Sequence, residues 1–488
     1  MTTSTQTRIG PLTRRTAVML AASVAAGPLL SACSIVGAGD GGGSDDVVVV
    51  GYQSKTINTV TAGTLLRERG YLEKELAALG KRTGKTYRVS WEDYATGAPI
   101  TAQMIAGKID IGSMGDYPLL INGSRAGTGS DGTEMIAVTG YNSDGALNGV
   151  VVARDSSAKT LTDLAGGSIS ASVGSAGHGT LVQALEKAGI DPTNGVRVEN
   201  QDPSVGASAL KAGSVDAVAQ FVAWPGLLAY QDDARLVYDG GELDTPTLHG
   251  TVVRKEYAAD NPGVVKAFLR AQIEATDFLH RHPLQAATIV AKQTGLPAEV
   301  VYLYNGAGGI STFDPTIKPS QVTALRHDVP FLSSIGVLSD KLDVGAFVDD
   351  SLLRSVYGSG YDAQRRSLAN PAAITGRDRA CGRRVTDAAT AGEVWVKGED
   401  ATRPTADAGC LLRNVLAAED DGKTVRAAYL PDAVTGTRWF ADKMIWFRTG
   451  TGYAAVATEQ AAASYADAHP AATRLSWRQA LDSVGGAA

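Results

Sequence analysis

Short apolar runs alternate with longer amphipathic stretches along most of this chain. Residues 47–50 are four consecutive valines, the pattern of a strand that is buried on both faces of a parallel sheet. Apolar positions at helical spacing follow over 64–79, and residues 87–91 form the next strand-like run. This succession of strand, helix and strand predicts an α/β fold with a parallel sheet.

Two stretches of the sequence are similar to each other. Residues 104–112 and 210–218 each have a helical pattern ending in Ala-Gly, then a turn residue, a β-branched residue, an aspartate and a short strand-like run. The glycine in each copy suits a left-handed helix C-cap. An aromatic residue followed by proline comes next in both copies, at Tyr117 and at Trp224. We therefore predict two α/β lobes of similar design around a cleft.

Polar residues and glycines follow several predicted strands and come just before predicted helices. In open α/β sheets, ligands bind outside the carboxyl ends of the strands. The free N–H groups at the start of a helix also favour negative charge. We therefore predict a cleft there that suits an oxyanion or a compact polar solute. Its predicted residues are Tyr52, Gln53, Thr96, Gly97, Gly115, Asp116, Tyr117, Ser175, Gly177, His178 and Trp224.

The roles of four polar residues near this cleft differ. His178 could donate a hydrogen bond to an anion, or it could cap a helix or pack. Asp116 would repel an anion directly, so it would orient its neighbours or meet the ammonium group of a zwitterion such as an aminosulfonate. We expect Asp110 and Asp216, the aspartates of the two similar stretches, to stabilise turns.

The N-terminal segment has the pattern of an export signal. Arginines without any acid precede an apolar run from about residue 17 to residue 30. This order is typical of a signal peptide, and the run is shorter than the roughly 20 apolar residues that a membrane span needs. Residues 34–46 are rich in Gly, Ser and Asp, which predicts a flexible tether.

The end of the apolar run, Leu30-Ser31-Ala32-Cys33, resembles a bacterial lipobox. The resemblance implies that residues 1–33 hold a lipoprotein signal peptide and that Cys33 is lipidated. The protein would then be anchored on the outer face of the plasma membrane. Arg14 and Arg15 leave both the Sec and the twin-arginine (Tat) export routes open. The alternative is an ordinary signal peptide in which Cys33 is incidental.

The composition and the charge of the chain mainly exclude other classes of function. Hydrophobic residues make up 44% of the chain and charged residues 20%, as in ordinary globular proteins. The net charge of −6, without a Lys/Arg block, gives no basic footprint for nucleic acid, so any anion site must be local. The Gly-x-Ser-x-Gly, His-Glu-x-x-His and phosphate-loop motifs are missing from the sequence. We expect a monomeric binding protein without a cofactor, and not an enzyme.

Several motifs together resemble the nitrate/sulfonate/taurine group of ABC-transporter solute-binding proteins, over about residues 47–357. They are Gly51-Tyr52-Gln53, the segment 107–112 leading to 115–118, the segment 160–166, Gly174-Ser175 before a helix, and the segment 212–217. Family members bind nitrate, sulfonates, taurine, bicarbonate-like anions and heterocycles, so the motifs leave the solute open.

This resemblance implies the type II periplasmic-binding-protein fold, with lobe 1 at about 47–142 and 248–357 and lobe 2 at about 146–243. It implies that the chain crosses from one lobe to the other twice, near 142–147 and near 243–249. It also implies that the lobes close about a hinge around the solute, which is then delivered to a membrane permease. It also implies ligand contacts for Gln53, Thr96, Asp116, Ser175, His178 and Trp224.

The C-terminal region has a different pattern. Residues 358–379 are rich in Gly, Ser, Arg and Asn and predict a linker. Strand-like runs then occur at 392–396, 425–430, 438–447 and 453–456, with a helical pattern at 458–469. They predict a small α+β domain over 380–488. Cys381-Gly382, Cys410-Leu411-Leu412, Gly452 and Tyr465-Ala466 resemble the NosL-type copper accessory lipoproteins.

The sequence departs from that family's Cys-x-x-Cys-Gly-Met pattern. Asp378 replaces the first cysteine, and Arg383 replaces the methionine. Soft sulfur ligands are what hold Cu(I), so most of a copper site is missing, and Cys381, Cys410 and Met444 remain as candidates. In an oxidising compartment Cys381 and Cys410 could instead form a disulfide, with a stabilisation of about 3 kcal/mol.

Three other functions are alternatives to solute capture. A lipoprotein that handles copper or a metal complex would use the C-terminal domain. A thiamine-pyrimidine-synthase-like enzyme would share the lobes, but the resemblance ties that chemistry to iron and a cysteine-rich stretch, and residues 47–357 have no cysteine. A sensor on the cell surface would bind a solute without delivering it to an importer.

Overall fold

The computed structural model describes residues 46–127, 129–338, 341–450 and 452–485. The predicted signal peptide, the predicted lipidation site at Cys33 and nearly all of the predicted tether lie outside these residues. Within the described ranges, no helix is long and apolar enough to cross a membrane.

The first lobe is built on a mixed sheet of six strands in the order β11-β4-β10-β3-β1-β2. Strands β1, β2 and β3 run parallel, as the strand–helix–strand pattern predicts. Strand β10, which follows the second crossing, lies antiparallel between β3 and β4. The strands are β1 (Asp46–Tyr52), β2 (Tyr87–Asp93), β3 (Ile111–Gly115), β4 (Thr133–Asn142), β10 (Thr247–Arg254) and β11 (Thr312–Phe313).

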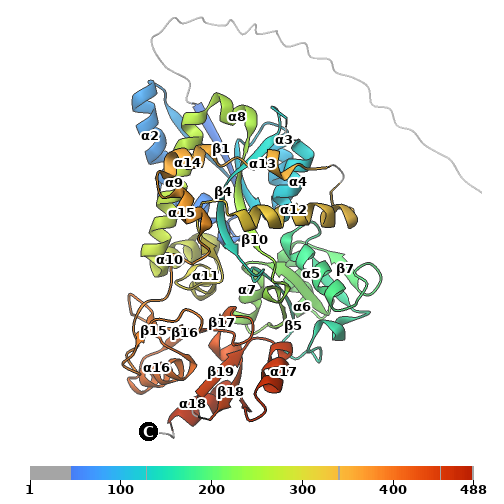
Figure 1. Ribbon diagram of the computed structural model, residues 1–488, viewed down its shortest axis with the longest axis vertical. Coiled ribbons are helices and arrows are strands. Elements are labelled where there is room, and N and C mark those ends of the chain that lie inside the picture. The colour runs from blue at the N-terminus through green and yellow to red at the C-terminus, as the bar shows by residue number, and fades with distance from the viewer. Residues whose placement is uncertain (1–45, 128, 339–340, 451, 486–488) are drawn as a thin grey trace, which may run out of the picture. The chain divides into compact units, whose positions relative to one another are not determined.

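The second lobe has a sheet of five strands in the order β7-β6-β8-β5-β9. Strand β6 pairs in parallel with β7 and β8, and β5 is antiparallel to β8 and β9. The predicted α/β fold with two lobes is therefore confirmed (Figure 1). The strands are β5 (Asn148–Ala153), β6 (Ser168–Ala171), β7 (Arg197–Asn200), β8 (Ala217–Phe221) and β9 (Ala234–Asp239).

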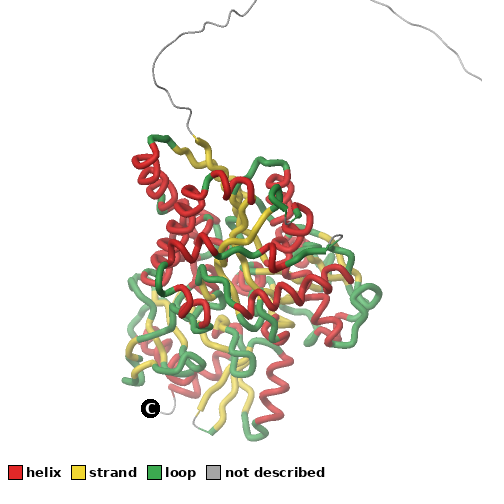
Figure 2. Tube along the Cα trace, turned by 45° about the horizontal axis from the view of Figure 1, so that its top comes forward, coloured by secondary structure: helices red, strands yellow, loops and turns green. Residues whose placement is uncertain are grey.

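Helices flank both sheets (Figure 2). The first lobe holds η1 (Ile57–Ala62), α1 (Thr64–Glu68), α2 (Tyr71–Thr83), α3 (Gly97–Ile105), α4 (Asp116–Ala126), α8 (Lys255–Asp260), α9 (Pro262–Arg281), α10 (Pro283–Thr294), α11 (Ala298–Asn305), α12 (Pro319–Ser334), α13 (Val344–Phe347) and α14 (Ser351–Tyr357). The second lobe holds η2 (Leu161–Leu164), α5 (Ala176–Lys187), α6 (Pro203–Lys211), α7 (Trp224–Tyr230) and η3 (Gly240–Leu243).

The single helix predicted over 64–79 is two helices in the structure. Helix α1 ends at Glu68, and α2 begins at Tyr71. Gly70 between them has a φ of 63°, a left-handed conformation that glycine adopts without steric cost. The apolar spacing continues across the break, so the periodicity alone does not reveal it.

The C-terminal region contains three small sheets and three helices among its described residues. Strands are β12 (Gly376–Arg377), β13 (Arg384–Val385), β14 (Gly392–Val396), β15 (Arg403–Thr405), β16 (Val425–Pro431), β17 (Arg438–Phe440), β18 (Ile445–Thr449), β19 (Gly452–Val456) and β20 (Thr473–Leu475). The helices are α16 (Ala408–Asp420), α17 (Glu459–Ala468) and α18 (Trp477–Gly485), with the short turn η4 (Ala441–Lys443).

The strand predicted over 438–447 is divided between two sheets. Strand β17 pairs with β16, whereas β18 pairs with β19 and β20. The turn η4 between them is fixed by a hydrogen bond of 2.8 Å from Trp446 Nε1 to Ala441 O. Residues on both sides of the turn are buried and apolar, so their pattern reads as one continuous strand.

The predicted linker 358–379 contains a short helix, α15 (Tyr361–Arg366), packed on the first lobe. Tyr361 is 1% exposed, and its hydroxyl donates to Asp350 Oδ2 at 2.6 Å. Lys318 Nζ donates to Gln364 O at 2.7 Å. This half of the segment is therefore folded, because a buried tyrosine and two local polar contacts offset its glycine- and arginine-rich composition.

The C-terminal region contacts both lobes. Tyr429 Oη donates to Glu299 O in the first lobe at 2.9 Å, and Thr435 Oγ1 donates to Asp239 Oδ2 in the second lobe at 2.8 Å. One continuous cluster of buried apolar residues includes Val48, Leu228 and Trp446, from the two lobes and the C-terminal region. The C-terminal region therefore shares a core with the lobes.

Candidate functional site: a cleft between the lobes

A cavity of about 410 Å³ lies between the two lobes. Five of the residues predicted from the sequence line it, namely Gln53, Thr96, Gly97, Gly115 and Ser175. Each lies at the end of a strand or the start of a helix. Gln53 directly follows β1, Thr96 and Gly115 precede α3 and α4, and Ser175 precedes α5. The carboxyl ends of β1 and β3 in the first lobe and of β6 in the second lobe thus border the cavity, as expected for open α/β sheets.

Local geometry explains two of these residues. A Cβ atom on Gly97 would lie 2.6 Å from Cβ of Pro118, so only glycine lets α3 and α4 start this close together. Ser175 Oγ accepts a hydrogen bond of 3.2 Å from the backbone N–H of His178, the usual role of a serine at a helix N-cap. These contacts hold the free N–H groups at the starts of α3 and α5 around the cavity.

The side chain of Gln53 is fixed in the cavity floor. It is 4% exposed, and its Nε2 donates to Ser113 O at 3.2 Å. Thr56 Oγ1 donates to Gln53 Oε1 at 3.4 Å. Gln53 therefore presents a neutral, oriented amide to the cavity.

His249 also lines the cavity, although it was not predicted as a site residue. It lies in β10, is 3% exposed, and its Nδ1 is 2.5 Å from Nδ2 of Asn58. An amide nitrogen only donates, so Nδ1 accepts and Nε2 carries the ring proton. Burial lowers the pKa of His249 to about 3. The ring is therefore a neutral donor, with Nε2 beside Gly115.

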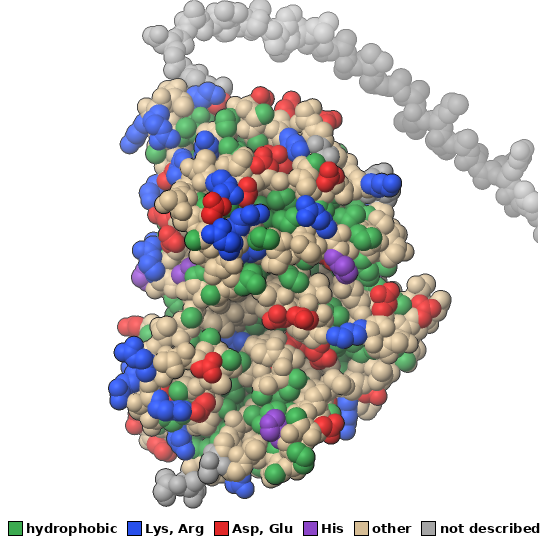
Figure 3. Space-filling model, viewed as in Figure 1, with side chains coloured by type: hydrophobic (Ala, Val, Ile, Leu, Met, Phe, Trp, Pro, Cys, Tyr) green, Lys and Arg blue, Asp and Glu red, His purple; other side chains and the backbone are tan. Residues whose placement is uncertain are grey.

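Other lining residues were missed because no local signal distinguishes them. They include apolar side chains on both sides of the cavity and one exposed cation: Ile121, Phe221, Val337 and Arg125. Both basic and acidic side chains are scattered over the face in Figure 3. Among the described residues, Arg125 is the one arginine or lysine in the cavity lining, and Asp202 is the one acidic residue there.

Six residues predicted for the cleft lie outside its lining, namely Tyr52, Asp116, Tyr117, Gly177, His178 and Trp224. Their strand or helix positions were predicted correctly, but their side chains turn to other contacts. Tyr52 Oη accepts a hydrogen bond from Arg67 Nη1 at 2.6 Å. Trp224, in the first turn of α7, packs against the main core, which is the apolar cluster that the lobes and the C-terminal region share. A Cβ atom on Gly177 would lie 2.7 Å from the backbone of Gln220, so Gly177 serves helix–strand packing.

In the structure, His178 makes a local contact at the start of a helix, which is one of the roles that the sequence left open. Its Nδ1 accepts from the backbone N–H of Gly174 at 3.4 Å. The residue is 8% exposed, and burial lowers its pKa. In this structure His178 therefore closes the turn before α5.

Asp116 and Tyr117 organise the lobe junction behind the cleft. Asp116 accepts hydrogen bonds from the backbone N–H groups of Tyr117 at 2.8 Å and Leu248 at 3.1 Å. Tyr117 Oη accepts from Gln183 Nε2 of the second lobe at 2.7 Å, and its ring lies directly against Gly179. Asp116 thus orients the chain after the second crossing, and Tyr117 connects the lobes.

A second carboxyl group lies beside Asp116. Asp328 and Asp116 both line a small cavity of about 10 Å³, and Asp328 is 3% exposed. Burial raises the pKa of Asp116 to about 6. Burial, and then the charge of Asp116, raise the pKa of Asp328 to about 8. Two carboxyl groups with a raised pKa therefore lie together at the lobe junction.

The cysteines of the C-terminal region are joined in the structure. Cys381 and Cys410 form a disulfide with a Cα–Cα distance of 5.8 Å. Asp378 lies next to them, and its nearest carboxylate oxygen and the two sulfur atoms are all within 4.8 Å of one another. Met444 is 5% exposed and packs in the main core. In a disulfide, the two sulfurs are not available as thiolate ligands for copper.

Comparisons with known proteins agree with this geometry. The model of the NMT1/THI5-like family matches residues 96–286. A putative aliphatic sulfonates-binding protein of Escherichia coli (strain K12) is 27% identical over 288 residues, which are 58% of this chain and 82% of that protein. The taurine-binding periplasmic protein of the same strain is 28% identical over 229 residues, which are 46% of this chain and 68% of that protein.

A solved structure shows the same architecture. It is the alkanesulfonate-binding protein SsuA from Xanthomonas axonopodis pv. citri bound to MOPS, with a TM-score of 0.53 and 22% identity. The match covers 63% of this chain and 99% of that chain. The lobes therefore have the two-lobed fold of periplasmic solute-binding proteins. The C-terminal region is an addition to that fold.

Proposed function

We propose that this protein is the exported solute-binding lipoprotein of an ABC importer and that it captures an organic sulfonate between its lobes. The observation that carries the proposal is the cavity of about 410 Å³ between the lobes, which is lined by Gln53 and His249 and by the starts of α3 and α5. The likeness to sulfonate- and taurine-binding proteins supports it. The lipobox at Cys33 supports an anchor on the outer membrane face.

The size and the walls of the cavity favour an organic anion over nitrate. Cavities that hold organic ligands measure roughly 300–1,000 Å³, and this cavity falls within that range. Ile121, Phe221 and Val337 line it with apolar surface, which favours burial of a carbon chain. A nitrate ion would fill only a small part of the space.

The sulfonate group would accept hydrogen bonds from neutral donors. They are His249 Nε2–H and the free backbone N–H groups at the starts of α3 and α5, whose helix dipoles favour negative charge. Hinge closure would then bring the second lobe, with Ser175 and Phe221, onto the solute. The closed form would be the one presented to the permease.

Isothermal titration calorimetry on the full chain tests this function. We expect ethanesulfonate, hexanesulfonate, MOPS and taurine to give binding isotherms, and nitrate to give none. His249→Ala should weaken sulfonate binding, whereas His469→Ala is the control, because His469 is exposed at the end of α17, in the C-terminal region. Binding of nitrate in preference to every sulfonate would refute the proposed substrate class.

A metal-handling function is the second candidate, because Asp378, Cys381 and Cys410 come together. Competition for Cu(I) with a chromophoric chelator, on the reduced full chain, tests it. An enzyme of the thiamine-pyrimidine-synthase type has less support, because residues 47–357 contain no cysteine.

A further inference from the structure

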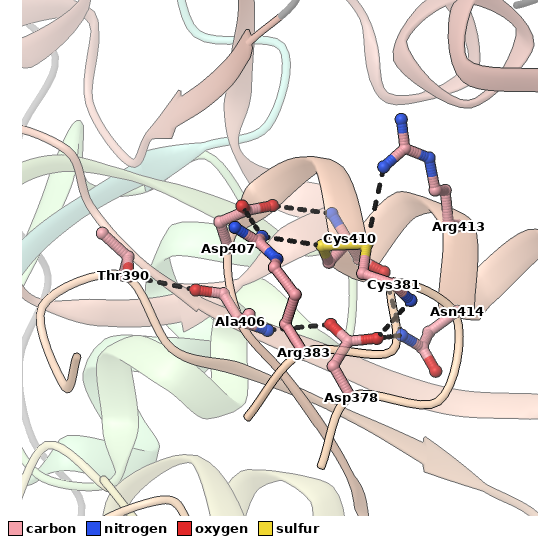
Figure 4. The surroundings of a disulfide bond; sticks show 9 residues. All are labelled: Asp378, Cys381, Arg383, Thr390, Ala406, Asp407, Cys410, Arg413 and Asn414. Atoms are coloured by element: carbon pink, nitrogen blue, oxygen red, sulfur yellow. Dashed lines mark hydrogen bonds and ion pairs between the residues drawn. A yellow bond between two sulfur atoms is a disulfide. The ribbon is translucent and has the colours of Figure 1, made fainter. Parts of the chain in front are cut away.

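The disulfide between Cys381 and Cys410 lies between two guanidinium groups (Figure 4). Arg383 Nη2 is 3.0 Å from Cys410 Sγ, and Arg413 Nη1 is 3.4 Å from Cys381 Sγ. A neutral disulfide gains little from a nearby cation, whereas a thiolate gains much more, since it carries a full negative charge. The two arginines therefore favour the cleaved form of this bond.

The position of Cys410 adds to this effect. Cys410 is the third residue of α16, and its backbone N–H donates to the N-cap carboxylate of Asp407 at 2.8 Å. The positive end of a helix dipole stabilises a thiolate in the first turn. Cys410 is 1% exposed, whereas Cys381 is half-buried. Cys381 is thus the sulfur that an outside reagent reaches, and Cys410 is the better leaving group.

Two carboxylates lie near the sulfurs and oppose this field. Asp407 forms an ion pair with Arg383. Asp378 is 0% exposed and accepts hydrogen bonds of 2.9 Å from Cys381 N, Ala406 N and Asn414 Nδ2. These three neutral donors satisfy the Asp378 carboxylate, whose negative charge remains beside the sulfurs and opposes the two arginines.

The contacts of Asp378 have a second consequence. They tie the Cys381 loop to α16 through nitrogen and oxygen atoms only. The two cysteines therefore stay adjacent when the S–S bond is broken, and the bond can form again without refolding.

We propose that Cys381 and Cys410 form a thiol–disulfide exchange site for an external thiol. The external thiolate attacks Cys381 Sγ, the S–S bond breaks, and its electron pair moves to Cys410 Sγ beside Arg383. A second thiolate then attacks the external sulfur of this mixed disulfide. The Cys381 thiolate leaves beside Arg413, and the external disulfide departs. In total, two thiols are oxidised, one protein disulfide is reduced, and the thiol protons go to water or to the new protein thiols.

Reduction of the folded full chain tests this proposal. A Cys33→Ser background leaves only two cysteines. The oxidised protein is incubated with glutathione, a monothiol, or with dithiothreitol, a dithiol, and free thiols are trapped with maleimide and counted by intact-protein mass spectrometry. Near-ultraviolet circular dichroism reports whether the fold persists. We expect reduction in the folded state, with a glutathione adduct on Cys381 in the monothiol reaction only.

Arginine variants separate an exchange site from a structural disulfide. Arg383→Gln and Arg413→Gln should each slow reduction by about threefold, because the leaving thiolate becomes more basic. Arg448→Gln, at an exposed arginine of the same region, should leave the rate unchanged. A disulfide that resists both thiols until the protein unfolds would overturn the proposal, and so would equal rates in wild type and both arginine variants. Neither result depends on which solute the cleft binds.

Discussion

Asn58 and His249 lie 191 positions apart in the sequence, yet their side-chain nitrogens are 2.5 Å apart in the cavity wall. Asn58 belongs to η1, just after the β1 loop, and His249 belongs to β10, just after the second crossing. The pair therefore fixes the ring of a cleft residue across the two segments of the first lobe.

Removal of either partner should weaken sulfonate binding. His249→Ala removes a neutral donor to an anion and should cost about 1.5–3 kcal/mol of binding free energy. Asn58→Ala leaves the ring in place but frees its orientation, so its cost should be smaller, about 1 kcal/mol. Calorimetric Kd values at neutral pH measure both. If Asn58→Ala costs more than His249→Ala, Asn58 does not act through His249.

The affinity for sulfonates should not follow histidine protonation. Burial lowers the pKa of His249 to about 3, so the ring stays neutral from about pH 5 to pH 8. A charged imidazolium donor would instead lose affinity as the pH rises through about 6.5. Titrations of ethanesulfonate at several pH values distinguish these cases. A loss of affinity centred near the ordinary histidine pKa would contradict the neutral-donor assignment.

Stability should fall as the pH rises through the range of the Asp116–Asp328 pair. Both carboxyl groups have a raised pKa, about 6 for Asp116 and about 8 for Asp328. Such groups stabilise the fold while they are protonated, and this contribution is lost as the pH rises through the folded-state pKa.

Asp328→Asn should remove part of this pH dependence. We expect it to raise Tm by about 1–3 °C above pH 8 and to change little near pH 5. Thermal unfolding followed by circular dichroism is the measurement. A matched control is Asp202→Asn, at an exposed carboxylate on the cleft rim. Equal pH profiles for wild type and Asp328→Asn would show that Asp328 is not the titrating group.

A buried ion pair within the C-terminal region lies against the first lobe. Arg438 Nη2 is 2.7 Å from Glu393 Oε2, both side chains are 4% exposed, and Arg438 also donates to Ala307 O. Arg438→Met should destabilise the protein by about 3–5 kcal/mol, because it leaves the buried Glu393 charge without a positive partner. Glu393 Oε1 then keeps only the neutral donors Tyr302 Oη and Thr402 Oγ1.

Denaturant unfolding of three variants tests this contact. The double variant Arg438→Met/Glu393→Gln should recover much of the loss, since no charge is then left unpaired. Arg478→Ala, which breaks an ion pair between exposed side chains, should change stability by less than about 1 kcal/mol. Equal losses in the single and double variants would show that the unpaired charge is not the cause.

The sequence by itself determined the design of each lobe. Gly107 and Gly213, where the helical part of each of the two similar stretches ends, have φ angles of 69° and 67°. Asp110 Oδ2 accepts from Val49 N at 2.9 Å, and Asp216 Oδ2 accepts from Ser168 N at 2.7 Å. The two glycine conformations depend on short-range geometry at a helix end, so a local pattern predicts them. The two aspartates were expected to stabilise turns, but they bond to strands that lie 61 and 48 positions away in the sequence.

Only the tertiary structure decided which side chains face the cavity. His249 lines it, although nothing near it in the sequence marks it, because the second crossing inserts β10 next to β3. Tyr117 and Trp224 follow the correct strands but turn to the other lobe and to the core. The C-terminal region likewise shares a buried core with the lobes, although a change in composition along the chain predicts a separate domain there. The physical reason is common to all three: a local pattern fixes where a helix or strand begins, whereas packing against distant segments fixes the direction in which each side chain points.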